Sequence, residues 1–433
     1  MDHTRSRVVI VGAGAAGVTV AARLAGLPAD VSLVDPDPRP GRGVAYSTGH
    51  AGHLLNTPAG RMSAFPDEPD HFVRWASRLT GRAVGPGEFL ARHHFGTYLG
   101  SVLAGCPVRH VRARAVGVRA GAVELADGRA LPFDAAVLAV GAFPSSGSWA
   151  PPALVADSRF VPNPWSANAF VSVPDDLDVL LVGTGLTAVD VTMLLDRPGR
   201  VVHAVSRHGL LPRAHAPSRP VDVPRVEGCS DLDSVRALLV GRVRALGDWR
   251  TAVDGLRPVT AGLWQRLSEV DRARFLAEDV RLWDVRRHRM PPAAASWVGR
   301  TRAVGRLRVH RGSVVAADLF RRAVHVRLST GSVLRVGAVV DCTGQHNDPA
   351  LATDPLIRSL LRTGLIRRDP LGLGIRTAPD GRVLPLDAPL WTIGAPRRGD
   401  LWETTAYPEI RAQATTVAES VATHLSTTAY HAA

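Results

Sequence analysis

The stretch Val8-Val9-Ile10-Val11-Gly12-Ala13-Gly14-Ala15-Ala16-Gly17 decides the fold of the N-terminal part of this 433-residue chain. Its apolar start is typical of a buried parallel strand, and residues 18–24 continue as a helix. Gly12 permits a tight turn, and Gly14 lets the backbone approach a pyrophosphate. Gly17 lets the helix and the strand pack closely. The order of strand, glycine loop and helix therefore predicts a dinucleotide-binding site.

An acidic residue at the end of the next strand supports the same site. The apolar run Val31-Ser32-Leu33-Val34 ends at Asp35, at the spacing where a carboxylate accepts hydrogen bonds from a ribose. FAD has the 2′-hydroxyl that such a carboxylate needs. Ala15 and Ala16 lie where the helix begins, and the positive end of a helix dipole favours the pyrophosphate there. The first site is thus predicted to bind FAD.

The same pattern occurs a second time in the middle of the chain. The strand Leu177-Asp178-Val179-Leu180-Leu181-Val182 leads into Gly183-Thr184-Gly185-Leu186-Thr187-Ala188, with alanine in place of the third glycine. The strand that follows ends at serine and arginine instead of an acid, which suits the 2′-phosphate of NADP. An arginine present only through composition is the alternative. The predicted contacts are Gly183, Gly185, Leu186, Thr187, Ser206 and Arg207.

Two dinucleotide sites in one chain define an organisation in which NADPH reduces a resident FAD. Apolar runs at 134–141 and 336–344 are predicted return strands, and they end at Gly141 and Gly344, where backbone would approach a cofactor. The expected fold is α/β, with two Rossmann-like dinucleotide-binding domains and a helical segment. The FAD domain is expected to span 1–170 and 336–433. The NADPH domain is inserted between them as 171–335, with a helical insert at 220–300.

Three residues are candidates for the reaction itself. The segment Arg281–Pro292 is rich in cations, and it is either a solvated helix face or a wall for an anionic substrate or the NADPH phosphates. His288 and Arg289 are the favoured residues of that wall. Asn56 lies in a loop punctuated by glycine and proline, where ligands of doubly wound sheets bind. It is predicted to bind the flavin or the substrate, although an ordinary turn asparagine is the alternative.

The C-terminal region adds two candidates. Trp402 and Thr404 precede a helix predicted over Pro408–His424, since proline is favoured in the first turn of a helix. The N-terminus of that helix would stabilise negative charge on a reduced flavin ring. Trp402 and Thr404 are therefore predicted to contact the cofactor.

Composition excludes several classes of protein. The net charge is +13, but all 52 basic residues are arginines spread along the chain, as a GC-rich genome would produce, so no nucleic-acid partner is expected. The absence of lysine excludes Schiff-base chemistry. The three cysteines form no C-x-x-C pair, which argues against a dithiol centre or a metal site. Short apolar runs and the lack of a secretory pattern predict a cytoplasmic protein without a membrane partner.

These motifs resemble those of FAD/NAD(P)-binding flavoproteins with two dinucleotide folds, related to the class B flavin monooxygenases. The two glycine loops carry this resemblance, which spans nearly the whole chain. Residues 42–46, 283–289 and 401–406 look like a narrower actinobacterial subgroup, similar to the enzymes that N-hydroxylate aspartate. The resemblance implies that NADPH reduces FAD, and that a C4a-(hydro)peroxyflavin passes oxygen to a nucleophilic nitrogen. Residues 159–166 lack the glycine and histidine of the signature of Baeyer–Villiger and flavin-containing monooxygenases, which argues against those two classes and not against the general class.

The sequence therefore predicts an FAD- and NADPH-dependent monooxygenase that N-hydroxylates a small amine or amino acid such as aspartate. Its expected partners are that substrate and O2, and the oligomeric state stays open. An NAD(P)H reductase that passes electrons to a protein partner is one alternative. An aromatic or urate-type hydroxylase is another, although such hydroxylases usually lack a separate NADPH fold. A redox-sensing flavoprotein is a third.

Overall fold

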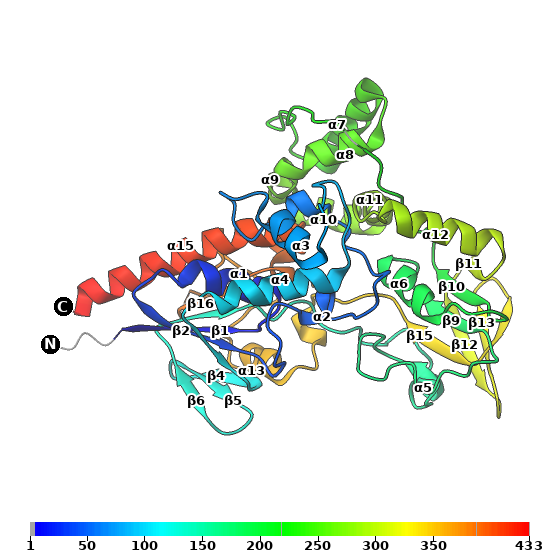
Figure 1. Cartoon of the computed structure of the whole chain (residues 1–433), viewed down its shortest axis with the longest axis horizontal. Helices are drawn as coiled ribbons and strands as arrows, with labels where there is room; N and C mark the ends of the chain where they lie inside the picture. The colour runs from blue at the N-terminus through cyan, green and yellow to red at the C-terminus, as the bar shows by residue number, and fades with distance from the viewer. Residues whose placement is uncertain (1–4, 218, 387, 433) are drawn as a thin grey trace.

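The computed structural model describes residues 5–217, 219–386 and 388–432 (Figure 1). Its first sheet is fully parallel and contains the strand before the first glycine loop. The buried valines and isoleucine of that strand explain its central position, because both faces of the sheet are covered. In spatial order the strands are β16 (Leu390–Thr392), β7 (Ala135–Leu138), β1 (Ser6–Val11), β2 (Ala29–Val34) and β3 (Val108–Val111).

Helices cover one face of this sheet and a small antiparallel sheet covers the other. On the first face, α1 (Ala15–Leu24) packs between α15 (Tyr407–Ala432) and α4 (Arg92–Ala104). The predicted C-terminal helix is thus confirmed and extends beyond His424. The second face carries α13 (Pro355–Arg362) and the strands β4 (Ala115–Arg119), β5 (Ala122–Leu125) and β6 (Ala130–Pro132).

A second parallel sheet contains the strand before the second glycine loop. Its strands in spatial order are β11 (Leu307–Arg311), β10 (Val202–Ser206), β9 (Val179–Val182), β15 (Ala338–Asp341) and β8 (Phe160–Val161). One face packs on α6 (Leu186–Leu195) and α12 (Pro292–Ala303). The other packs on the antiparallel strands β12 (Val314–Leu319), β13 (Val324–Leu328) and β14 (Val333–Val336). The expected α/β fold with two Rossmann-like domains is confirmed.

Two strands differ from the predicted division of the chain. Both β8 and β15 belong to the second sheet, although residues up to 170 and from 336 onward were assigned to the FAD domain. The four buried residues of β15 would suit the centre of either parallel sheet. In the structure β15 pairs with β9 and so belongs to the second sheet. The second domain therefore includes both strands at its boundaries.

Five helices form the insert that projects above the two sheets in Figure 1. They are α7 (Leu232–Leu246), α8 (Trp249–Leu256), α9 (Thr260–Arg266), α10 (Glu269–Glu278) and α11 (Val280–Arg287). Apolar residues recur at helical spacing over residues 263–282, but the chain there divides among α9, α10 and α11 and does not form one helix. Ser268 accepts a hydrogen bond from the Asp271 amide and caps a new helix there, which is a more favourable role for serine than a helix interior.

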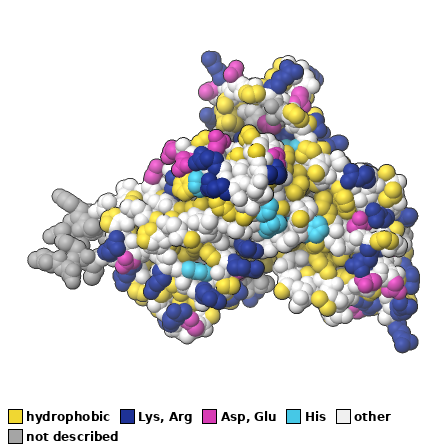
Figure 2. Space-filling model, in the orientation of Figure 1, with side chains coloured by type: hydrophobic (Ala, Val, Ile, Leu, Met, Phe, Trp, Pro, Cys, Tyr) yellow, Lys and Arg dark blue, Asp and Glu magenta, His cyan; other side chains and the backbone are white. Residues whose placement is uncertain are grey.

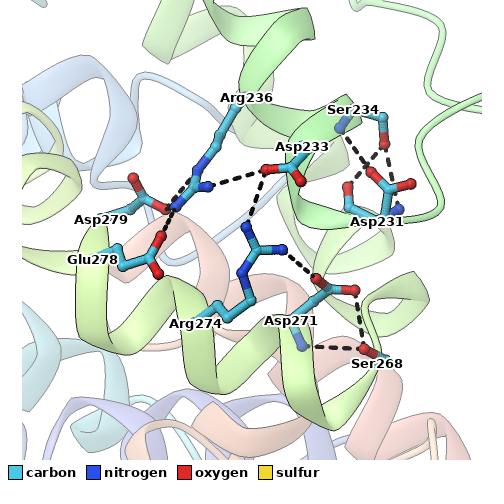
Figure 3. A network of polar contacts seen from close by, with 9 residues as sticks. All are labelled: Asp231, Asp233, Ser234, Arg236, Ser268, Asp271, Arg274, Glu278 and Asp279. Carbon is cyan, nitrogen blue, oxygen red and sulfur yellow. Dashed lines mark hydrogen bonds and ion pairs between the residues drawn. The ribbon is translucent and has the colours of Figure 1, made fainter.

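A network of charged side chains fastens α7 to α10 within the insert (Figure 3). Arg236 contacts Glu278 and Asp279, each at 2.6 Å. Arg274 bridges to Asp233 and Asp271, both at 3.3 Å. Because each guanidinium group contacts more than one carboxylate, the network orders the two helices better than an isolated surface ion pair would.

A buried ion pair joins the first part of the chain to the second domain. Arg92 of α4 lies 2.6 Å from the carboxylate of Asp190 on α6, and both side chains are largely buried. His53 contacts the carbonyl oxygen of Asp190 at 3.0 Å, and burial lowers the pKa of its ring. Removing one member of such a pair leaves an uncompensated buried charge, so this contact fixes how the two domains meet.

The surface shows charges of both signs. Figure 2 shows basic side chains scattered over the face in view, with acidic ones among them. No helix in the described residues is long and apolar enough to cross a membrane.

The remaining helical elements complete the fold. They are α2 (Gly43–Tyr46), η1 (Ala59–Arg61), α3 (His71–Thr80), α5 (Pro152–Val155), η2 (Arg257–Val259), η3 (Pro349–Leu351), η4 (Ala395–Arg397) and α14 (Arg398–Leu401).

Candidate cofactor and substrate site

The first glycine loop has the close packing that its sequence predicts. Gly12 has a φ of +103°, and a Cβ there would lie 2.4 Å from the carbonyl oxygen of Ala139. A Cβ on Gly17 would lie 1.8 Å from the carbonyl oxygen of Gly12. Gly14 precedes the first residue of α1, so the backbone amides of Ala15 and Ala16 open the helix. This cradle fits a dinucleotide pyrophosphate.

Asp35 stabilises that loop directly. One carboxylate oxygen accepts the Ala13 amide at 2.7 Å, and the other accepts the Asp37 amide at 2.8 Å. Each carboxylate oxygen can accept a further hydrogen bond. The contact of Asp35 with a ribose therefore stays a prediction that this geometry permits.

The second loop repeats the arrangement at the start of α6. Gly183 has a φ of +120°, and a Cβ there would lie 2.1 Å from the carbonyl oxygen of Cys342. Gly185 precedes the helix, whose first turn contains Leu186 and Thr187. Burial raises the pKa of the Cys342 thiol well above its usual value, as expected of a packing residue.

The return strands end in matching glycines. Gly141 and Gly344 follow β7 and β15 with φ values of +71° and +95°, and open space lies where each Cβ would stand. Both leave room for a ligand at the carboxyl edge of their sheets, where ligands of such sheets bind.

The end of β10 contains a contact that the sequence did not reveal. Arg281, at the start of α11, donates from Nη2 to the hydroxyl of Thr184 at 3.0 Å and to the carbonyl of Leu210 at 2.7 Å. Ser206 lies 2.8 Å from the same hydroxyl, and Arg207 is exposed beside it. The insert therefore reaches the second glycine loop.

Asn56 and Arg289 approach each other around a histidine that the sequence did not single out. His215 Nε2 lies 2.9 Å from the carbonyl oxygen of Asn56. Burial, followed by the charge of Arg289, lowers the pKa of His215 to about 4. The neutral ring donates its Nε2 proton to Asn56 and holds the Asn56 loop beside the arginine.

Arg289 is the most deeply buried member of an arginine cluster, which comprises Arg61, Arg257, Arg287 and Arg289 with Asp254, Glu403 and Glu409. Its side chain is 4% exposed and pairs through Nη2 with Asp254. Its Nε and Nη1 atoms are buried, and neither has a hydrogen-bond partner among the described residues. Unpaired buried donors of this kind are costly unless a ligand satisfies them.

The other members of the arginine cluster come from distant segments. Arg257 pairs with Glu409 through two N–H···O contacts. Arg287 lies 3.3 Å from Glu403 and 3.4 Å from Glu409. Desolvation and the charge of Arg257 lower the pKa of Arg61. The arginine cluster thus combines four guanidinium groups, of which that of Arg61 is exposed to solvent, with three carboxylates, a net charge of +1.

His288 borders the arginine cluster: burial lowers the pKa of its ring, and the nearby charge of Glu403 raises that pKa while the charge of Arg287 lowers it. His288 is the C-cap residue of α11, and its Nε2 atom is 3.7 Å from Asp284, with the side chain partly exposed. The arginines of the segment Arg281–Pro292 therefore point to two different places. Arg281 reaches the second glycine loop, and Arg287 and Arg289 belong to the arginine cluster. The predicted role of His288 stays a prediction.

Trp402 and Thr404 lie between the insert and the first domain. Trp402 stacks on Trp264 of α9 at 4.8 Å between ring centroids. The Thr404 hydroxyl is buried without a partner among the described residues, and its carbonyl oxygen accepts from Gln413. Gln413 also accepts the Gly394 amide, and a Cβ on Gly394 would lie 3.9 Å from Ala16. The start of α15 thus adjoins the first glycine loop, and an unsatisfied hydroxyl there suits a polar cofactor.

Acid should destabilise this protein partly through His215. Its folded pKa of about 4 lies below the ordinary value of 6.5, so protonation favours the unfolded state and stability falls as the pH drops from 6.5 towards 4. His215→Gln keeps an N–H donor and should flatten that part of the profile, measured as the free energy of unfolding in urea. His208→Gln, at an exposed position, is the control. An unchanged slope in His215→Gln would contradict this assignment.

Comparison with known proteins places the fold in a class. Residues 9–143 match a family model described as FAD-NAD(P)-binding, so the N-terminal part of the chain is an FAD/NAD(P)-binding domain. No curated protein matches the sequence significantly. Over the whole chain, the fold is that of flavoproteins with two dinucleotide-binding domains.

Within that class, the similar solved structures include amino-acid N-hydroxylases. An ornithine hydroxylase from Pseudomonas aeruginosa has a TM-score of 0.62 at 16% identity, covering 98% of this chain and 100% of its own. The ornithine N-hydroxylase of Kutzneria sp. 744, solved with reduced FAD, NADP+ and L-ornithine, gives 0.61 at 16% identity, covering 96% and 99%. The L-lysine 6-monooxygenase from Pseudomonas syringae gives 0.62 at 18%, covering 97% and 100%. The chain has the fold of these flavin monooxygenases.

Proposed function

We propose that this protein is an FAD- and NADPH-dependent monooxygenase that N-hydroxylates a small acidic amino acid, with aspartate as the first candidate. FAD belongs to the first glycine loop and NADPH to the second, while O2 is the co-substrate. The geometry of both loops supports this assignment, since each has a glycine whose Cβ would collide with backbone. The fold shared with ornithine and lysine hydroxylases supports oxygen transfer to nitrogen.

The observation that carries the acidic substrate is the state of Arg289. Its buried Nε and Nη1 atoms carry three N–H donors that have no partner among the described residues, and these can donate charge-assisted hydrogen bonds to carboxylate oxygens. The excess positive charge of the arginine cluster favours an anion as well. Ornithine and lysine, which the related enzymes hydroxylate, end in a cationic group at the position that the reaction modifies. Aspartate instead places a second carboxylate close to its amine.

The arginine cluster also favours the reactive form of the amine. Bound FAD, reduced by NADPH, supplies the activation of oxygen. The substrate nitrogen must be neutral to attack as a nucleophile, and nearby positive charge lowers the pKa of an ammonium group. Arg289 and its neighbours would hold the carboxylates and thereby orient the amine. Asn56, held by His215, lies beside them and restricts the position of the ligand.

The proposal is tested by following NADPH oxidation in FAD-loaded protein with a panel of amino acids. We expect aspartate to stimulate oxidation and to yield a hydroxylamine product, while ornithine and lysine do neither. Fast reduction of ferredoxin or cytochrome c without an organic product would establish the reductase alternative instead. NADPH oxidation without any hydroxylamine over the full panel would also refute the proposal.

A further inference from the structure

The hydroxyl groups of Thr184, in the second glycine loop, and of Ser206, at the end of β10, have no proton left for a ligand. Thr184 has one O–H donor and two lone pairs. Its oxygen lies 2.6 Å from the Leu210 carbonyl, which can only accept, so Thr184 donates there. Its lone pairs then accept from Arg281 at 3.0 Å and from Ser206 at 2.8 Å. Thr184 is therefore saturated by the protein.

Ser206 follows from this assignment. Its single proton goes to Thr184, and its oxygen accepts the Gly209 amide at 3.1 Å. A phosphate group needs donors, and Ser206 has none to give without breaking the contact with Thr184. The sequence predicts that a serine and an arginine bind the 2′-phosphate together. The geometry instead leaves the donation of hydrogen bonds to that phosphate to cationic side chains.

Arg281 has the donors that Ser206 lacks. Its hydrogen bonds to other described residues run through Nη2 only, while a guanidinium group carries five N–H donors. The side chain is partly buried, and its two hydrogen bonds fix its direction. Burial lowers its pKa, the carboxylate of Asp284 raises it, and the charge of Arg207 lowers it, so Arg207 lies close enough to Arg281 for the two cations to repel each other. An anion between them would remove that repulsion.

We propose that Arg281 and Arg207 together bind the 2′-phosphate of NADPH, and that Arg281 is the specificity residue that the helical insert contributes. The end of the second strand in a Rossmann fold lies beside the adenosine ribose, which places the two cations at the 2′ position. A phosphate dianion matches two guanidinium groups in charge and geometry. The inference rests on the proposed assignment of NADPH to the second site.

The test measures binding rather than turnover. The affinities of FAD-loaded protein for 2′,5′-ADP and for 5′-AMP are compared by calorimetry, with circular dichroism to confirm folding. Wild-type protein should prefer 2′,5′-ADP. Arg281→Gln should weaken 2′,5′-ADP by about tenfold to 100-fold, as expected for lost charge-assisted hydrogen bonds, and leave 5′-AMP within about twofold. Arg281→Lys should recover part of the loss.

Two further variants make the assignment specific. Arg286→Gln removes a cation from the same helix and should change neither affinity, since Arg286 bonds only within α11 among the described residues. Ser206→Ala should weaken 2′,5′-ADP less than Arg281→Gln does. An equal loss for both nucleotides in Arg281→Gln, or a larger loss in Ser206→Ala, would overturn the inference.

These results are separable from the proposed reaction. A protein that prefers 2′,5′-ADP through Arg281 but forms no hydroxylamine keeps the inference and loses the proposed function. A protein that hydroxylates aspartate while binding both nucleotides equally keeps the function and loses the inference.

Discussion

Gly12→Ala should weaken FAD binding by about tenfold to 100-fold, because the left-handed backbone and the collision with Ala139 together cost roughly 1–3 kcal/mol. Gly12 has a φ of +103°, and its Cβ would lie 2.4 Å from a backbone oxygen that cannot move away cheaply. The loop must shift, and its amides then lose their aim at the pyrophosphate. Flavin fluorescence on titration of apoprotein with FAD measures the change.

Gly26→Ala is the matched control. Gly26 lies just beyond α1, and a Cβ at this position would stand in open space. The Gly26→Ala protein should therefore bind FAD with the affinity of the wild-type protein. Circular dichroism separates a loss of FAD from a loss of fold. A folded Gly12→Ala protein with wild-type affinity would show that the loop does not hold the cofactor.

Arg289→Gln should reduce kcat/KM for aspartate by about 100-fold or more, chiefly through a higher KM. The variant loses a charged donor group in a site shielded from water, and such contacts are worth roughly 2–5 kcal/mol. NADPH should still reduce FAD at the wild-type rate, because Arg289 belongs to the arginine cluster and Arg281 to the second loop. Steady-state hydroxylamine formation and stopped-flow flavin reduction measure the two quantities separately.

The ion pair with Asp254 requires its own control. Arg289→Gln leaves that carboxylate without its arginine, which lowers stability as well as binding. The double variant Asp254→Asn/Arg289→Gln should regain stability but not aspartate turnover. Arg300→Gln, at an exposed position on α12, should affect neither. Aspartate turnover restored in the double variant would show that Arg289 acts through the fold alone.

The sequence predicts the glycine loops well because they are local. Strand, loop and helix are adjacent in the chain, and the collisions around Gly12, Gly17 and Gly183 follow from backbone that any such turn brings together. The long helix at the C-terminus is likewise predictable from its start at Tyr407 and Pro408, although its end is not.

The arginine cluster is not predictable in this way. Arg61, Asp254, Arg289 and Glu409 are far apart in the chain, and only the folded insert brings them together. His215 is similar, since its role depends on a contact with Asn56, 159 positions away. The apolar sequence of β15 suits the centre of either parallel sheet, so the sequence does not predict its pairing with β9, which depends on tertiary contacts.

Helix α11 has a consequence for how the two ligands would affect each other. Arg281 at its first turn touches the second glycine loop, and Arg287 at its last residue belongs to the arginine cluster, about 9 Å farther along the helix axis at 1.5 Å per residue. Because α11 has only eight residues, a shift that one ligand imposed on this helix would also displace the residues that face the second ligand. Thermodynamic reciprocity then requires that aspartate alter the dissociation constant of NADP+ by the same factor by which NADP+ alters that of aspartate.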